Sequence, residues 1–217
     1  MTRTEIAQSI ADSGIVAILR ADSSTGLIQA VEALLAGGVT TMEVTMTTPG
    51  ALAVVAEAVA RFGREILMGV GSVLDPGMAS AALAAGAEFI VTPVTKPEVI
   101  RLCNRAGKPI ASGALTPTEA WLGHESGADF IKLFPAELGG PGYIRSLLAP
   151  LPMLRIIPTG GVTPETCGDF LRAGSVALGA GSALVSREIL AASDWPQLTA
   201  RAMRFVAAVR AAREAKA

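Results

Sequence analysis

The sequence predicts an α/β fold, a single (β/α)8 TIM barrel, on two observations. Short, β-branched apolar segments alternate with longer segments of helical periodicity, and eight such segments occur within the 217 residues. Hydrophobic residues make up 51% of the chain and charged residues 17%, which supplies one large core and excludes a disordered or fibrous chain. We therefore expect one TIM-barrel domain over residues 1–217.

Glycines mark the ends of the predicted helices. They recur at intervals of 20 to 26 residues, followed by one double interval of 47. Glycine suits the left-handed position that ends many helices, and proline in the Thr-Pro, Asp-Pro and Lys-Pro pairs further along suits a first helical turn. The glycines are Gly37, Gly63, Gly86, Gly107, Gly127 and Gly174.

The apolar segments that follow most of these glycines are the predicted strands. Continuous apolar strands alternating with helices are typical of a parallel sheet covered by helices. A doubly wound open sheet is the competing architecture, but no G-x-G-x-x-G follows the first strand and the repeat runs to eight, so we prefer the closed barrel. The predicted strands are 15–20, 40–46, 66–73, 89–94, 109–114, 130–135, 155–160 and 176–181.

Apolar stripes at helical spacing define the helices between these strands. Leu27, Val31 and Leu34 form one stripe, and similar stripes follow each strand. We also expect a short helical segment over residues 1–14 before the first strand and a C-terminal helix over about 194–214.

The charge balance excludes several classes of partner. Lys and Arg number 18 and Asp and Glu 19, so we expect neither a nucleic acid nor a membrane partner. No apolar stretch is long enough for a membrane span, and residues 1–14 do not resemble a signal peptide. The two cysteines, Cys103 and Cys167, form no disulfide framework, which favours a cytoplasmic location.

One lysine lies in the middle of a predicted strand. In Phe130-Ile-Lys-Leu-Phe-Pro, alternation places Phe130, Lys132 and Phe134 on one face, and the aliphatic neighbours on the other face should meet the helices. Lys132 then points into the barrel, where burial favours the neutral amine that forms a Schiff base with a ketone. An ordinary strand-end lysine that reaches water is the alternative.

Glu43 is the acidic counterpart of Lys132. It is flanked by strand on both sides, and alternation turns Thr41, Glu43 and Thr45 inward. Glu43 and Lys132 could form a buried ion pair, or a nucleophile with its proton shuttle.

Anion-binding features gather at the predicted C-terminal ends of the strands, where barrel enzymes hold their sites. Arg20 ends the first strand, and its guanidinium offers a fork of hydrogen-bond donors to an anion. An ordinary strand-end arginine in contact with water is the alternative. Glycine-rich turns, 158–161 and 179–182, end the seventh and eighth strands, where many barrels bind phosphate. With His124 as the single histidine, a His-rich metal site is excluded, and we expect no metal.

Five motifs in chain order resemble the 2-keto-3-deoxy-6-phosphogluconate (KDPG) aldolases, which also cleave 4-hydroxy-2-oxoglutarate (KHG). The motifs are E-V-T at 43–45, G-x-G-S-V at 69–73, K-L-F-P-A-E at 132–137, P-T-G-G-V at 158–162 and G-S-A-L at 181–184. The resemblance implies a class I aldolase, a carbon–carbon lyase without cofactor, that acts as a homotrimer on pyruvate and a keto acid phosphate. It implies cleavage of KDPG to pyruvate and glyceraldehyde 3-phosphate, with KHG as a further substrate.

The resemblance also implies roles for individual residues. Lys132 matches the Schiff-base lysine and Glu43 the general acid/base, and the remaining matches bind substrate. They are Ser72 near the pyruvate carboxylate, Pro93 and Phe134 as pocket walls, Thr159 against the substrate, and Gly160, Gly161, Gly181 and Ser182 at the phosphate.

One position departs from many family members. These carry an arginine four residues after the catalytic glutamate, whereas this chain has Thr47 there, so we expect Arg20 to replace it. The galactonate epimer of the substrate (KDPGal) therefore remains an alternative. An isomerase or epimerase on a phosphate-binding barrel, and a barrel that binds without turnover, remain as further alternatives.

Overall fold

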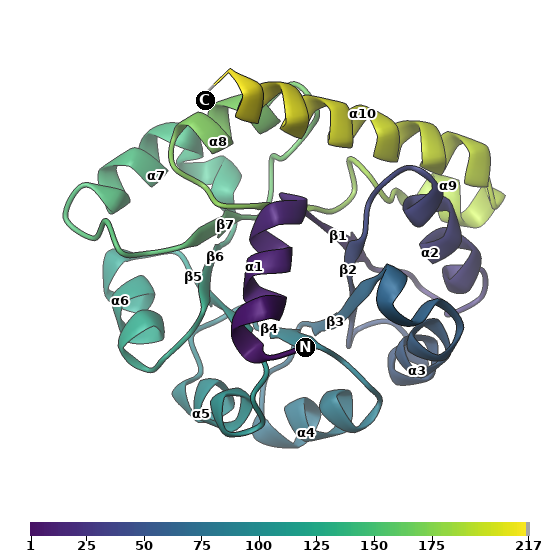
Figure 1. The fold of residues 1–217 in the computed structure, drawn as a ribbon, viewed down its shortest axis with the longest axis horizontal. Coiled ribbons are helices and arrows are strands. Elements are labelled where there is room, and N and C mark those ends of the chain that lie inside the picture. The colour runs from purple at the N-terminus through teal and green to yellow at the C-terminus, as the bar shows by residue number, and fades with distance from the viewer. Residues whose placement is uncertain (216–217) are drawn as a thin grey trace.

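The predicted (β/α)8 barrel is confirmed by the structure, a computed structural model that describes residues 1–215. The expected domain range, 1–217, extends two residues past these, and Lys216 lies outside the described residues. Eight parallel strands follow the spatial order β7-β6-β5-β4-β3-β2-β1-β8, and a bridge between Thr159 and Gly179 joins β7 to β8. The ring of strands and the outer ring of helices are visible in Figure 1.

Each observed strand lies within its predicted range and is shorter by one to three residues at one or both ends. The strands are β1 (Ile15–Leu19), β2 (Thr41–Thr45), β3 (Leu67–Gly71), β4 (Phe89–Val91), β5 (Ile110–Ala114), β6 (Phe130–Leu133), β7 (Ile156–Pro158) and β8 (Leu178–Ala180).

Helices follow every strand and cover the outside of the barrel. They are α2 (Leu27–Ala36), α3 (Ala51–Phe62), α4 (Pro76–Ala84), α5 (Pro97–Arg105), α6 (Pro117–Glu125), α7 (Gly140–Leu148), α8 (Cys167–Arg172), α9 (Arg187–Ala192) and α10 (Trp195–Glu214). Helix α1 (Arg3–Ser13) precedes the barrel, and two 3-10 turns, η1 (Gly63–Glu65) and η2 (Ala136–Leu138), complete the order.

Several helix boundaries follow the predicted signals. Helices α4, α5 and α6 each begin at a proline, and Gly86 and Gly107 take the left-handed conformation after a helix. Gly37 does not, since its φ is -82°, and Gly38 takes that conformation instead. Gly37 is required for another reason: a side chain there would collide with Ala202 of α10.

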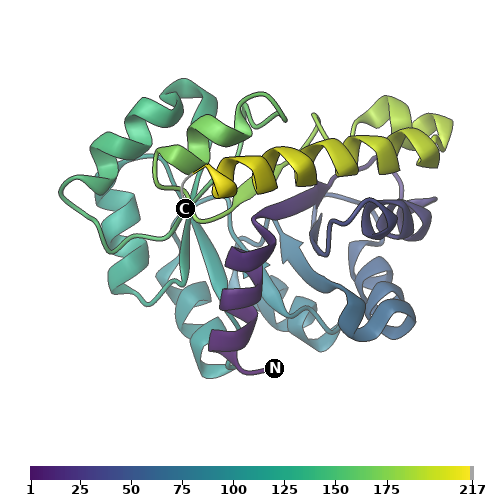
Figure 2. The same cartoon turned by 45° about the horizontal axis from the view of Figure 1, so that its top comes forward.

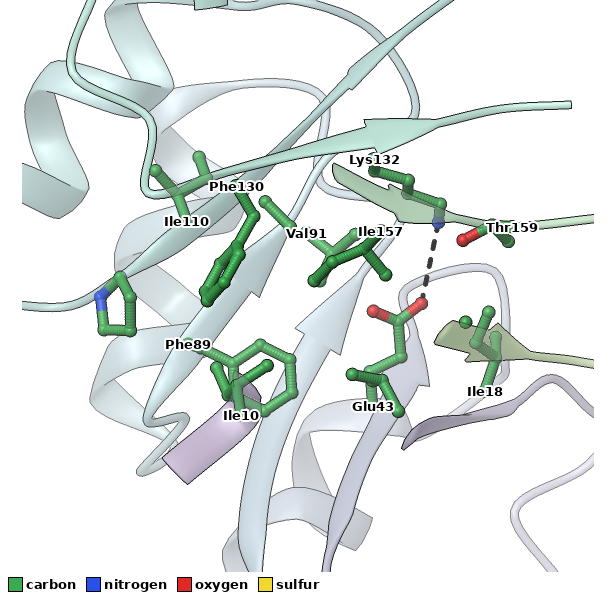
Figure 3. Close-up of a pocket in the computed structure, with 14 residues that line it drawn as sticks. Ile10, Ile18, Glu43, Phe89, Val91, Ile110, Phe130, Lys132, Ile157 and Thr159 are labelled. Carbon is green, nitrogen blue, oxygen red and sulfur yellow. Dashed lines mark ion pairs between the residues drawn. The ribbon is translucent and has the colours of Figure 1, made fainter. Parts of the chain in front are cut away.

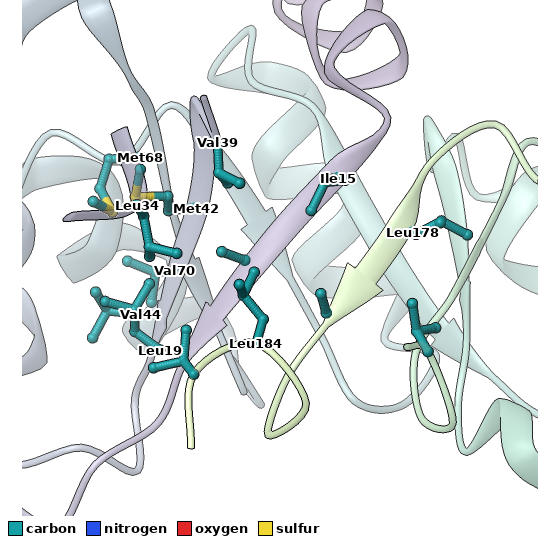
Figure 4. Close-up of a cluster of buried hydrophobic side chains, with 14 of the residues drawn as sticks. Ile15, Leu19, Leu34, Val39, Met42, Val44, Met68, Val70, Leu178 and Leu184 are labelled. Carbon is teal, nitrogen blue, oxygen red and sulfur yellow. The ribbon is translucent and has the colours of Figure 1, made fainter. Parts of the chain in front are cut away.

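The apolar residues form two separate clusters. The larger lies between strands and helices and contains the outward-facing residues Met42 and Val44 (Figure 4). Ile131 belongs to the same cluster. The smaller fills the barrel interior, where Phe89 and Phe130 pack with Ile10 of α1.

Helix α1 lies across the N-terminal opening of the barrel. In Figure 1 it crosses the centre of the strand ring, and its buried residues Ile6, Ala7 and Ile10 join the interior cluster. The helix is attached to the C-terminal helix, seen lengthwise in Figure 2, because Arg213 donates to the backbone carbonyls of Ala11 and Asp12. The interior is therefore accessible mainly from the C-terminal ends of the strands.

Burial of Ile131 provides a test of the outer cluster. Ile131 is 1% exposed on β6, so Ile131→Ala should lower the free energy of unfolding by about 2–5 kcal/mol in urea titrations. Leu138 is 72% exposed, and Leu138→Ala should change it by less than about 0.5 kcal/mol. Equal effects of the two substitutions would contradict this packing.

Candidate active site

The lysine and the glutamate that sequence alternation turned inward meet inside the barrel. The Nζ atom of Lys132 on β6 lies 3.8 Å from Oε1 of Glu43 on β2, and the two side chains are 9% and 2% exposed. In Figure 3 the pair lies beside an apolar interior, with Thr159 next to the amine. An amine and a carboxyl group held this way can exchange a proton with each other and with a bound molecule.

Glycines on the neighbouring strands allow close packing around this pair. A side chain at Gly71 of β3 would place its Cβ 2.5 Å from Oε1 of Glu43, and one at Gly179 of β8 would collide with the Thr159 hydroxyl. Gly113 is paired in register with Lys132 and lies so close to Pro93 that a side chain would strike its backbone. Large inward side chains therefore alternate with glycines around the barrel.

Burial determines the protonation behaviour of Glu43. Removal from water raises the pKa of its carboxyl group above the ordinary value of 4.5, and the positive charges of Lys132 and Arg20 act in the opposite direction. Oε1 accepts no hydrogen bond from any described residue. A carboxyl group whose pKa is raised toward neutrality is suited to both giving and taking a proton.

A second, wider cavity opens above the pair, toward the C-terminal ends of the strands. It has a volume of about 500 Å³ and is lined by residues that follow β6, β7, β8 and β1. Ile18, Thr159 and Gly179 line both this outer cavity and the small cavity around the pair. A molecule in the outer cavity can therefore reach the Lys132 amine past these three residues.

The outer cavity offers several donors to an anion. The amides of Gly161, Ser182 and Ala183 donate to no other described residue. Arg20, Gly160 and Gly181 line the same cavity. Unpaired backbone amides next to a guanidinium are a suitable setting for a phosphate or carboxylate.

Of the other residues implied by the family motifs, Phe134 lies at this opening. Phe134 is 38% exposed, lines the outer cavity, and its ring centre is 5.6 Å from the Lys132 Nζ atom. Ser72 follows β3 and has a φ of 58°, a strained value for a residue with a side chain. Neither Ser72 nor Pro93 is among the described residues that line the two cavities.

Two charged residues of the outer cavity were missed by sequence analysis. Glu137 and Arg187 both line it, together with Arg20. Glu137 belongs to the K-L-F-P-A-E motif, whose position directly after the lysine strand could have identified it. Arg187 begins α9, five residues after Ser182, where nothing in the local pattern distinguishes it from a surface arginine.

The remaining reactive side chains are poor candidates. Burial raises the pKa of Cys103 to about 12, and that of Cys167 to about 12, so both thiols stay protonated and weakly nucleophilic. The His124 ring lies 5.6 Å from the Trp121 ring on α6, tilted by 41°. Within residues 1–215, no three His, Cys, Asp or Glu side chains cluster as metal ligands, and no helix could span a membrane.

The raised pKa of Glu43 predicts a specific pH dependence of stability. Between pH 4.5 and the raised pKa of the folded state, the unfolded chain has lost this proton while the folded protein retains it, so the Glu43 contribution to stability falls as the pH rises. Glu43→Gln removes this contribution. Urea titrations from about pH 5 to pH 8 should show the unfolding free energy of the variant, minus that of the wild type, increasing with pH. A difference that is constant or decreases would contradict the raised pKa.

Comparison with known proteins identifies relatives that cover nearly the whole chain. The family model of KDPG and KHG aldolase matches residues 6–201. The 2-dehydro-3-deoxy-phosphogluconate aldolase of Pseudomonas aeruginosa is 32% identical over 86% of this chain and 85% of its own. The KHG/KDPG aldolase of Escherichia coli is 32% identical over 92% and 94%, and the 2-dehydro-3-deoxy-6-phosphogalactonate aldolase of the same organism is 34% identical over 78% and 83%.

Solved structures of the same family are also similar to this chain. A native KDPGal structure has a TM-score of 0.86 at 33% identity, over 92% of this chain and 96% of its own. The KDPG aldolase of Legionella pneumophila, crystallised with pyruvate captured as a covalent carbinolamine, has a TM-score of 0.82 at 27% identity, over 91% and 96%. The match of the family model across residues 6–201, with these relatives, shows that the chain belongs to the KDPG and KHG aldolase family.

Proposed function

We propose that this chain is a class I aldolase that reversibly cleaves KDPG to pyruvate and glyceraldehyde 3-phosphate, and that also accepts KHG. The observation that carries the proposal is the Lys132–Glu43 pair, buried in the barrel and opening into a cavity with unpaired amides. Membership of the family supports an aldolase of this kind. The geometry around the pair supports the roles proposed below.

Lys132 is the proposed nucleophile. Its neutral amine attacks the C2 ketone, and Glu43, 3.8 Å away, donates a proton as the carbinolamine loses water. The resulting protonated imine accepts the electron pair of the C3–C4 bond when Glu43 takes the proton of the C4 hydroxyl. Glyceraldehyde 3-phosphate leaves, C3 of the enamine is protonated, and water releases pyruvate and restores the amine.

Arg20 is the proposed partner of the pyruvate carboxylate. Many family members use an arginine at the position of Thr47 for this purpose. Arg20 and Thr47 follow the adjacent strands β1 and β2, and the Ala21 amide donates to the Thr48 hydroxyl, which holds the two strand ends together. An arginine after either strand can therefore place its guanidinium in the same part of the cavity. Ser72 and Thr159 are proposed to contact the substrate, and Pro93 and Phe134 to wall the pocket.

The glycine turns are the proposed phosphate site. The free amides of Gly161 and Ser182, with Gly160 and Gly181 beside them, lie in the same outer cavity as Arg20. The galactonate epimer KDPGal is the second candidate substrate, favoured by the E. coli phosphogalactonate aldolase at 34% identity. We also propose a homotrimer, which is supported by the family motifs.

Borohydride reduction in the presence of pyruvate tests the proposed nucleophile. The imine between pyruvate and Lys132 should be reduced to a stable adduct, found by peptide mass on Lys132 and absent without pyruvate. Lys132→Ala should form no adduct and lose cleavage activity while retaining the wild-type circular dichroism spectrum. An adduct on another lysine, or undiminished turnover by the variant, would disprove the assignment. Lys96 and Lys108, elsewhere in the chain, are internal controls.

The role of Arg20 predicts a rescue experiment. Loss of a charge-assisted bond to the carboxylate in Arg20→Gln should raise the pyruvate concentration for half-maximal trapping about tenfold. Adding Thr47→Arg to that variant should restore much of the affinity, because the new guanidinium occupies the neighbouring strand end. Wild-type pyruvate affinity in Arg20→Gln would show that another group binds the carboxylate.

A further inference from the structure

Charge is unevenly distributed around the outer cavity. Its charged residues are Arg20, Glu137 and Arg187. Because β6, β7, β8 and β1 follow one another around the barrel, Glu137 lies on the β6 side of the two glycine turns. The two arginines lie on the β8 and β1 side. The proposed phosphate site therefore has cations along one flank and a carboxylate along the other.

The Glu137 side chain lies directly against the glycine turn after β7. A side chain at Gly160 would collide with the Glu137 carboxylate, and the Cβ of a residue at Gly161 would lie 2.9 Å from Cβ of Glu137. Among residues 1–215, no ion pair includes Glu137, and its carboxylate accepts no hydrogen bond. The carboxylate is thus an unpaired negative charge at the cavity wall.

The two substrate types differ at C5. Both have the C2 ketone and the C4 hydroxyl, so the bond between C3 and C4 is common to both. The next carbon, C5, carries a hydroxyl group in the phosphorylated six-carbon acids and is itself a carboxylate in KHG. Glu137 follows β6, the strand of Lys132, and lies against the glycine turn after β7 in the outer cavity. A substrate that extends from Lys132 to the glycine turns would therefore bring C5 toward Glu137.

Arg187 cannot distinguish the two substrate types by charge, because each carries an anion at its distal end. Its guanidinium lies 3.8 Å from the Asp22 carboxylate, with both side chains mostly exposed, so it can turn toward any anion in the cavity. A phosphate and a carboxylate would both be attracted. Discrimination at C5 therefore depends on the opposite flank.

We propose that Glu137 is a specificity-determining residue that selects a hydroxyl-bearing C5 over a carboxylate at that position. Its carboxylate accepts a hydrogen bond from the C5 hydroxyl and repels the C5 carboxylate of KHG. This inference rests on the proposed aldolase function and refines it: the preferred substrates are the phosphorylated polyhydroxy keto acids. Lys132 and Glu43 act identically on both substrate types.

The test compares kcat/KM for two substrates, KHG and the faster of the two C4 epimers of the phosphorylated acid, by pyruvate release. Glu137→Gln removes the charge but keeps an acceptor, so it should raise kcat/KM for KHG roughly fivefold and change that for the phosphorylated acid by less than about twofold. Glu137→Ala also removes the acceptor, and should lower kcat/KM for the phosphorylated acid roughly tenfold.

Glu165→Gln is the matched control. Glu165 is exposed, pairs with Arg204 at 3.0 Å and does not line the outer cavity, so its variant should keep the wild-type ratio of the two kcat/KM values. Trapping of pyruvate on Lys132 should be unchanged in all three variants. That half-reaction does not involve C5.

Two failures can be told apart. If pyruvate is trapped normally but Glu137→Gln keeps the wild-type substrate ratio, or lowers kcat/KM for KHG, the role of Glu137 is disproved while the proposed chemistry stands. If wild-type protein traps no pyruvate on Lys132, the proposed function itself fails.

Discussion

Burial of an amine beside a carboxyl group is the constraint on which the rest of this structure depends. Neither group is stable alone in an apolar interior, and each lowers the cost of burying the other. The 3.8 Å separation of Lys132 and Glu43 leaves them close enough to interact and free to engage a third group. The barrel supplies what this arrangement needs: rigid strands, glycines at the neighbouring inward positions such as Gly71, and a floor closed by α1.

The site is divided along the barrel axis. At the lower level, apolar side chains such as Phe89 and Phe130 exclude water from around the pair. At the upper level, polar backbone and charged side chains face a much larger space. The proposed nucleophile and its proton donor lie on strands, where positions are rigid, and the proposed phosphate site lies on loops, which can change without disturbing the pair.

Membership of the family defines the reaction class more closely than the substrate. Relatives at 32% to 34% identity are named for different substrates, although all are aldolases. In our proposal, substrate preference in this chain depends on charged side chains at the rim, on the flanks of the glycine turns.

The sequence by itself determined the eight strands, the alternation that turns Lys132 and Glu43 inward, and the glycine turns, because these follow from local periodicity and chain order. Only the tertiary structure decided which distant residues share a cavity. Glu137 and Arg187 belong to the site because the barrel closes between β7 and β8, which brings together segments that no local pattern relates. The sequence pattern likewise indicated that Gly37 ends a helix. The structure shows that this position has no room for a side chain, because α10, far away in the chain, packs against it.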